Sequence, residues 1–394
     1  MENNIRYQVP GMPIKNRSKV KRAIIISLII PAFILGYIAS YYYILPSVFP
    51  NILRGDLQNI LVFPTADGKY KLWIQTDGSF RATSRTNNHG AITLKTVGWF
   101  CRTYSYVYDP INEDLVNGFK TSYDDLPPEP HIIYEKEKIW VVNSSSDGVP
   151  PAIKVYDSKN YQEILNTQSF CEKNKELSSG IENLSVDHQR PVRFSISTKD
   201  GRELVYIPSD DKFFQNSIEL EKYYKQTDTT VSGIFSLTNE ENSGKRKKLY
   251  YITGPKYELY FSYSWTEEIV KQNISAFKNL KATEMLPEKI FIEGEILFTD
   301  DEFVVIVHQD NVGKNANRML TWVDKSGKEL WTAQQEDLFD EIKGKDDESA
   351  TEMSFLVHQL AVQRFGNEVI FIYKPVGAMG FQLTTGKKFW EFVD

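Results

Sequence analysis

Cysteine and histidine are scarce in this sequence, which has two cysteines and five histidines among 394 residues. Cys101 and Cys171 are not adjacent and form no C-x-x-C pair, so nothing supports a redox-active dithiol or a cysteine-based zinc site. The histidines stand far apart, with no pair at helical or strand spacing, and each is expected to be a surface or core residue. Their spacing predicts no metal site.

Motifs that bind phosphates or carry out hydrolysis are also missing. The sequence contains no G-x-x-x-x-G-K-[ST], G-x-G-x-x-G, G-x-S-x-G or H-E-x-x-H pattern, and no D-x-[DN]-x-[DN]-G calcium loop. The net charge of -6 is small and dispersed, which is atypical of a surface that binds nucleic acid. We therefore predict no catalytic residues, no cofactor and no nucleic-acid partner.

Long uncharged runs are absent except for one, residues 23–45, reading AIIISLIIPAFILGYIASYYYIL. As a helix this run would be roughly 35 Å long, enough to cross a hydrocarbon core of roughly 30 Å. It is longer than the apolar core of a secretory signal and lacks a clean A-x-A site, although cleavage stays open as the alternative. The sequence predicts a transmembrane signal anchor, with the lipid bilayer as the first partner.

The charges that flank this run predict its orientation. One acidic residue, Glu2, precedes it, together with six basic residues, Arg6, Lys15, Arg17, Lys19, Lys21 and Arg22. Basic residues favour the cytoplasmic side, so residues 1–22 are expected to be a cytoplasmic tail. A connector at 46–58 and a domain at 59–394 would then be periplasmic or extracellular, most simply on a bacterial inner membrane.

The two cysteines both fall on the expected outer side. In an oxidising compartment Cys101 and Cys171 could close a loop of about 70 residues, and such a bridge would contribute on the order of 4 kcal/mol. Two unpaired cysteines are the alternative.

Short runs rich in Val, Ile, Tyr and Phe dominate the outer part of the chain. Examples are Ile60–Phe63 before Asp67-Gly68, Lys138–Val142, and Glu368–Tyr373. Asp-Gly turns supply the positive φ angles of tight hairpins, so successive strands are expected to be antiparallel neighbours. Helical patterns are few and read as insertions, for example Lys212–Lys225. The sequence predicts an all-β domain.

Two segments near the C-terminus repeat one another: a strand, a polar turn with Gly-Lys, and a strand that carries tryptophan. The residues that define the repeat are Trp322, Asp324, Gly327, Trp331, Gly386 and Trp390. The aspartate and glycines can shape hairpin turns, and the tryptophans of the last strands can wedge between neighbouring sheets as large apolar knobs.

This pattern resembles the repeat of the quinoprotein-like (PQQ-type) β-propellers, clearly over 320–331 and 380–390 and weakly over the rest of 55–394. The resemblance implies a propeller of about seven blades, with six to eight allowed by the length, and short helical insertions. It also predicts ring closure by pairing of the final strand, Phe389–Val393, with a blade begun near residue 60. Catalytic members use a vicinal cysteine pair beside the cofactor, which this chain lacks, so the resemblance is to a non-catalytic member.

Anchor, propeller and missing motifs together predict a single-pass, membrane-anchored binding or scaffold protein of the cell envelope, with a protein partner there. An extracytoplasmic enzyme, an oxidoreductase or hydrolase with a loop-built site on the propeller face, is the alternative. A sensor is a third reading, though residues 1–22 are too few for a signalling domain. The sequence does not identify the partner, the blade count, the oligomeric state or the type of organism.

Overall fold

The computed structural model divides the chain into two units, Met1–Ile52 and Leu53–Asp394. It describes residues 32–33, 36–37, 40, 53–88, 91–99, 101–123, 129–145, 150–188, 191–240, 245–261, 279–313, 316–334, 360–373 and 377–393. The expected tail at 1–22 lies outside these residues, as does nearly all of the expected span at 23–45. No helix within the described ranges is both long and apolar enough to cross a bilayer.

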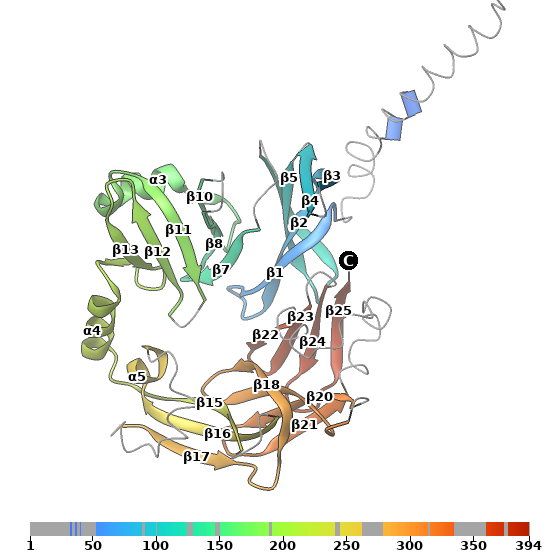
Figure 1. Ribbon diagram of the computed structural model, residues 1–394, viewed down its shortest axis with the longest axis vertical. Coiled ribbons are helices and arrows are strands. Elements are labelled where there is room, and N and C mark those ends of the chain that lie inside the picture. Colours follow the sequence, from blue (N-terminus) through green and yellow to red (C-terminus); the bar gives the residue numbers. More distant parts are fainter. Residues whose placement is uncertain are drawn as a thin grey trace, which may run out of the picture. The chain divides into compact units, whose positions relative to one another are not determined.

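The second unit is built from antiparallel sheets whose strands mostly follow one another in chain order (Figure 1). Sheet 1 has the strand order β1-β2-β5-β6, with the bounds Asp56–Pro64, Tyr70–Asp77, Arg102–Asp109 and Asp114–Ser122. The expected turn at Asp67-Gly68 joins its first two strands, and Gly68 has a φ of 78°.

Sheets 2 and 3 each have four strands as well. Sheet 2 comprises β7 to β10, with the bounds His131–Glu135, Lys138–Asn143, Ala152–Asp157 and Glu163–Asn166. Sheet 3 comprises β11 to β14, with the bounds Ile181–Asp187, Arg193–Thr198, Glu203–Ile207 and Lys212–Phe214. Between them lie the helix α3, Thr167–Lys173, and the 3-10 turn η2, Lys175–Leu177. The Asn166 side chain caps α3 by accepting from the Ser169 amide, which satisfies a donor that the first helical turn leaves free.

One helix follows sheet 3 in the chain, and another lies between two strands of sheet 4. The helix α4, Ser217–Thr227, occupies the second half of the helical segment expected at 212–225, whose first residues instead form β14. The helix α5, Lys256–Phe261, follows the second strand of sheet 4. The two helices contact each other, α4 contacts β14, and α5 contacts the first strands of sheet 4.

Sheet 4 has seven strands, and sheet 5 has four. The strands of sheet 4 are β15 to β21, with the bounds Val231–Asn239, Arg246–Pro255, Lys281–Met285, Phe291–Thr299, Phe303–Gln309, Arg318–Asp324 and Glu329–Gln334. Only two residues of β16, Arg246 and Lys247, pair with β18, so three strands are weakly joined to four. Sheet 5 comprises β22 to β25, with the bounds Leu360–Phe365, Glu368–Tyr373, Gly377–Gln382 and Lys388–Val393.

A separate hairpin interrupts sheet 1. Its strands β3, Phe80–Asn88, and β4, Ala91–Trp99, pair over their whole length and join no other sheet. The strands on either side of it in the chain, β2 and β5, pair directly with each other. The hairpin is therefore an insertion that the sheet does not need for its own strand order, and the sequence patterns above did not predict it.

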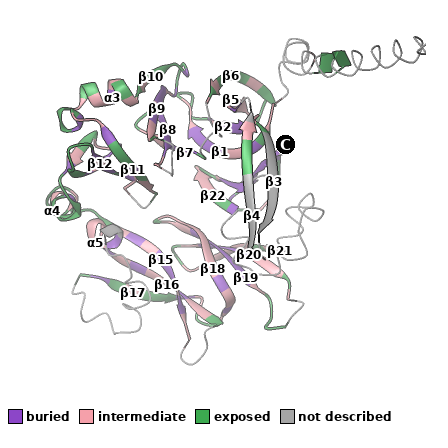
Figure 2. Cartoon of the chain, turned by 45° about the horizontal axis from the view of Figure 1, so that its top comes forward, coloured by how far each residue is buried: buried purple, intermediate pink, exposed green. Residues whose placement is uncertain are grey.

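Apolar side chains form the core, and Figure 2 shows that buried residues occur along strands of all the larger sheets. The middle strand β2 is buried on both faces, whereas the edge strand β6 alternates between exposed and half-buried residues, as expected when sheets pack face to face. Separate apolar clusters join sheet 1 to sheet 2, sheet 2 to sheet 3, and sheet 4 to sheet 5. A further cluster joins sheet 5 back to sheet 1.

This closure differs from the expected one. The final strand β25 pairs with β24, and β1 pairs with β2, so no hydrogen-bonded ladder links the last strand to an N-terminal one within the described residues. Side chains join the two sheets instead: the indole Nε1 of Trp390 donates to the hydroxyl of Tyr70, and Phe392 packs on Tyr108. Each of the two sheets already has four strands, so packing alone can close the array. The described fold is all-β and propeller-like.

Candidate functional site

The aspartate and the glycines of the repeat lie at equivalent turns. Asp324 ends β20, and its Oδ1 accepts from the amides of Ser326 and Lys328 at 2.9 and 3.1 Å. Gly327 completes this turn with a φ of 81°, a conformation that favours glycine. Burial raises the pKa of Asp324, but the hydrogen bonds from Ser326 and Lys328 outweigh it and lower the pKa overall. Gly386 lies in the corresponding turn of sheet 5, between its third and fourth strands.

The same aspartate turn recurs in two other sheets. Asp109, at the end of β5, accepts from the amides of Ile111 and Asn112, and Asp157, at the end of β9, accepts from those of Lys159 and Asn160. In every case the aspartate ends the third strand of a four-stranded set. The repeated residue shapes a turn, and nothing in its contacts assigns it a chemical role.

The tryptophans of the repeat join sheets. Trp331 stacks on the buried Trp322, with ring centroids 3.7 Å apart and planes 15° apart. Its Nε1 donates to the carbonyl of Leu383 in the next sheet at 3.2 Å. A Cβ on Gly386 would lie 2.6 Å from the Trp331 ring, so a side chain there would collide with it. Trp390 makes the corresponding contact from sheet 5 to Tyr70 of sheet 1.

The expected disulfide is not formed, and both cysteines are free. Cys101 is buried just before β5 of sheet 1, whereas Cys171 is on α3 and packs against the cluster between sheets 2 and 3. Each cysteine thus belongs to a different part of the core. Burial raises the pKa of the Cys171 thiol, which makes it a poor nucleophile.

Four strands from different sheets line a central cavity of about 1110 Å³. They are β1, β7, β18 and β22, and β1 contacts β7 while β18 contacts β22. The apolar lining residues include Leu61, Val62, Ile132, Ile133, Leu297, Phe298, Leu360 and Val362. The ionisable lining residues are Glu135, His188, Asp300, Asp301 and Arg364. A cavity with mixed walls of this size is typical of a binding site.

Polar contacts between sheets fix the walls of the central cavity. The amide of Val62 on β1 donates to the Gln363 side chain on β22 at 3.1 Å. Arg364 donates to Asp300 at 2.9 Å and to Glu302 at 2.8 Å, and its guanidinium lies 4.3 Å from the Phe303 ring centroid. These charge-assisted contacts hold the arginine against the wall.

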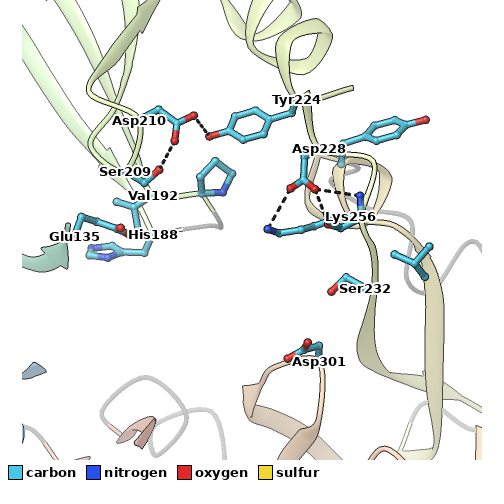
Figure 3. A pocket seen from close by; sticks show the side chains of 14 residues that line it. Glu135, His188, Val192, Ser209, Asp210, Tyr224, Asp228, Ser232, Lys256 and Asp301 are labelled. Atoms are coloured by element: carbon cyan, nitrogen blue, oxygen red, sulfur yellow. Dashed lines mark hydrogen bonds and ion pairs between the residues drawn. The ribbon is translucent and has the colours of Figure 1, made fainter. Parts of the chain in front are cut away.

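A second cavity of about 890 Å³ (Figure 3) shares the lining residues Glu135, His188, Val192 and Asp301 with the first, so the two are neighbours. Its other walls come from the turn after β13, from α4, and from the starts of β15 and α5. We call this second cavity the acidic cleft.

Carboxylates dominate the acidic cleft. Tyr224 donates to the Asp210 carboxylate at 2.9 Å, and Lys256 pairs with Asp228 at 3.1 Å. Burial, followed by the contact with Asp210, raises the pKa of Tyr224 well above its usual value, so the phenol stays neutral. The lining carboxylates are those of Glu135, Asp210, Asp228 and Asp301, against the single lysine among the described lining residues. This excess favours a cationic group in the cleft.

Folding brings together two histidines whose spacing in the sequence does not predict a pair. Nδ1 of His131 lies 2.9 Å from Nε2 of His188, although 57 residues separate them. His188 lines both cavities. In the described part of the chain no three histidine, cysteine or acidic side chains are grouped so as to hold a metal ion.

No family model and no curated protein matches this chain. Among solved structures it is similar to Sqt1 of Saccharomyces cerevisiae, at 8% identity over 86% of this chain and 85% of that one, with a TM-score of 0.24. It is also similar to the WD40 domain of SCAP from fission yeast, at 9% identity over 71% and 74%, with a TM-score of 0.24. A computationally designed protein, Ika8, matches at 12% identity over 86% and 87%, with a TM-score of 0.22. Scores this low add nothing to what the chain's own sheets show.

Proposed function

We propose that this protein is a membrane-tethered, extracytoplasmic binding protein without catalytic activity, and that a protein partner of the envelope inserts a segment into its neighbouring cavities. One observation carries the proposal: two neighbouring cavities of about 1110 and 890 Å³, with mixed polar and apolar walls, share four lining residues. Their combined volume suits a peptide segment better than a small metabolite. The tether is inferred from the apolar run at 23–45 and the basic residues before it.

We also infer a ring of six blades, one fewer than the sequence favoured. Sheets 1, 2, 3 and 5 supply one blade each, and the two-residue link between β16 and β18 divides sheet 4 into blades of three and four strands. The helices α4 and α5 bridge the place where sheets 3 and 4 follow one another. An experimental map that shows six sheets around the cavity would support this count, and seven would overturn it.

Site-specific photo-crosslinking in cells tests the binding function. A photoreactive residue replaces Ser232, which lines the acidic cleft, and the matched control carries it at Ile111, an exposed residue of the turn between β5 and β6. We expect a discrete protein adduct from Ser232 and none from Ile111. Failure to obtain an adduct at Ser232 and at Gln363, in the central cavity, would overturn the proposal.

The topology has its own test. A reporter enzyme that works only after export, fused behind Asp394, is expected to be active. A reporter that works only in the cytoplasm is expected to be silent at the same position. The reverse pattern would overturn the proposed orientation.

A further inference from the structure

The His131–His188 pair joins two sheets at the edge of the neighbouring cavities. His131 begins β7 of sheet 2, and His188 directly follows β11 of sheet 3. Their ring centroids are 5.1 Å apart, and the ring planes are inclined at 45°. His131 is half-buried and His188 is exposed, so solvent and small ions can reach the pair.

The separation of the two nitrogens matches a metal chelate. Imidazole nitrogens bind transition metals at about 2.0–2.1 Å, so two of them at 90° around one ion lie about 2.9 Å apart. At the wider angle of a tetrahedral site they would lie about 3.3 to 3.4 Å apart. The observed 2.9 Å is the length of the hydrogen bond between the rings, and it keeps the two nitrogens close enough to bind one ion at neighbouring positions once the rings turn.

Charge around the pair favours a cation. His188 lines the acidic cleft together with Glu135, Asp210, Asp228 and Asp301. The focused negative potential of such a cleft raises the local concentration of divalent ions and speeds their arrival.

We propose that His131 and His188 form a two-histidine site for a divalent transition metal, Cu(II) in preference to Ni(II). The order of affinities for nitrogen ligands places Cu(II) above Ni(II), and both ions accept 90° geometry. Water fills the remaining positions, since the described residues include no third ligand of suitable geometry. This inference does not depend on the proposed function.

Metal entry requires a specific rearrangement of protons. In the hydrogen-bonded pair one ring donates an N–H to the other, and metal binding needs a lone pair on both facing nitrogens. The donor ring therefore moves its proton to its second nitrogen, and both rings turn about their Cβ–Cγ bonds to face the ion. No net proton is released while both rings are neutral.

Titration of the purified full-length chain in detergent with copper sulfate at pH 7.5 tests the site. We expect one Cu(II) ion per chain, with electron paramagnetic resonance showing splitting from two nitrogen ligands. His131→Gln and His188→Gln are each expected to weaken binding at least tenfold. The matched control His89→Gln removes a histidine outside the pair and is expected to leave binding unchanged.

Two results would overturn the site. One is wild-type binding no tighter than that of the double variant His131→Gln/His188→Gln, and the other is a bound-copper spectrum without nitrogen splitting. The wild-type spectrum tests for nitrogen ligands even if a variant misfolds. Thermal unfolding of each variant shows whether that variant folds.

Discussion

At the scale of single residues, glycine and tryptophan side by side determine how the sheets meet at the junction of sheets 4 and 5. Trp331 lies between Trp322 of its own sheet and the turn of the next one. That turn has room for the ring because Gly386 has no side chain. The aspartates of the repeat shape turns within a sheet, whereas the tryptophans join one sheet to another.

The Gly386→Ala variant is expected to destabilise the domain by roughly 2–4 kcal/mol. Gly386 has a φ of 63°, so alanine is strained there, and its Cβ would also lie 2.6 Å from the Trp331 ring. The matched control is Gly366→Ala, because Gly366 has a φ of 57° and nothing lies within 4 Å of the new Cβ. This variant is expected to lose only the backbone strain energy of about 1–2 kcal/mol. Urea unfolding measures both. Equal losses in the two variants would show that the Trp331 contact is unimportant.

Buried tyrosines make the domain sensitive to alkali. Burial raises the pKa of Tyr156 to about 12, from about 10 in the unfolded chain. The folded state therefore holds this proton more tightly, so the associated stability is fully present below pH about 10 and is lost as the pH rises through about 12. We expect the urea concentration at the unfolding midpoint to decrease as the pH rises from about 10 to about 12. In Tyr156→Phe this decrease is expected to be smaller. An identical pH dependence in the variant would contradict this assignment.

At the scale of elements, short sequence patterns correctly predicted several strands and one turn. The strands at 60–63, 138–142 and 368–373 and the turn at 67–68 all form, because short apolar runs and Asp-Gly pairs act within a few positions. The β3–β4 hairpin was not predicted, since its threonine-rich strands carry little apolar periodicity. The His131–His188 pair and the cavities could not be predicted either, because they depend on which sheets become neighbours.

The β3–β4 hairpin is expected to be dispensable for folding. Its base is closed without it, since the Gly78 amide donates to the Arg102 carbonyl at 3.0 Å and β2 pairs directly with β5. Joining Ser79 to Cys101 through two glycines should change the unfolding free energy by less than about 1 kcal/mol, which corresponds to a melting shift of about 2–4 °C or less. Scanning calorimetry measures this shift.

A control deletion makes the hairpin experiment interpretable. Removing β6, Asp114–Ser122, which pairs with β5 along its length, should prevent folding of sheet 1. If loss of the hairpin were as damaging as loss of β6, the hairpin would be a structural part of the sheet.

At the scale of the whole molecule, closure depends on a contact between the last sheet and the first. Truncating Trp390, which is buried and bonded to Tyr70, to alanine is expected to cost about 3–5 kcal/mol. Its neighbour Phe389 is 43% exposed, so Phe389→Ala serves as the matched control, with an expected loss within about 0.5 kcal/mol.

The location of the Trp390→Ala effect distinguishes closure from a local defect. Hydrogen exchange should accelerate at the amides of β1 and β2 as well as in β24 and β25, because the shared cluster would lose its largest side chain. Acceleration confined to sheet 5 would show that the first sheet is stable without its neighbour.

The contact between Trp390 and Tyr70 spans 320 positions of the chain, and the one between Val62 and Gln363 spans 301. Ribosomes add about 5–20 residues per second, so roughly 16–64 s separate the synthesis of Tyr70 from that of its partner. Throughout this interval the apolar face of sheet 1 that sheet 5 later covers has no lasting cover. A holding chaperone that covers this face until sheet 5 has been made would therefore be expected to favour correct closure.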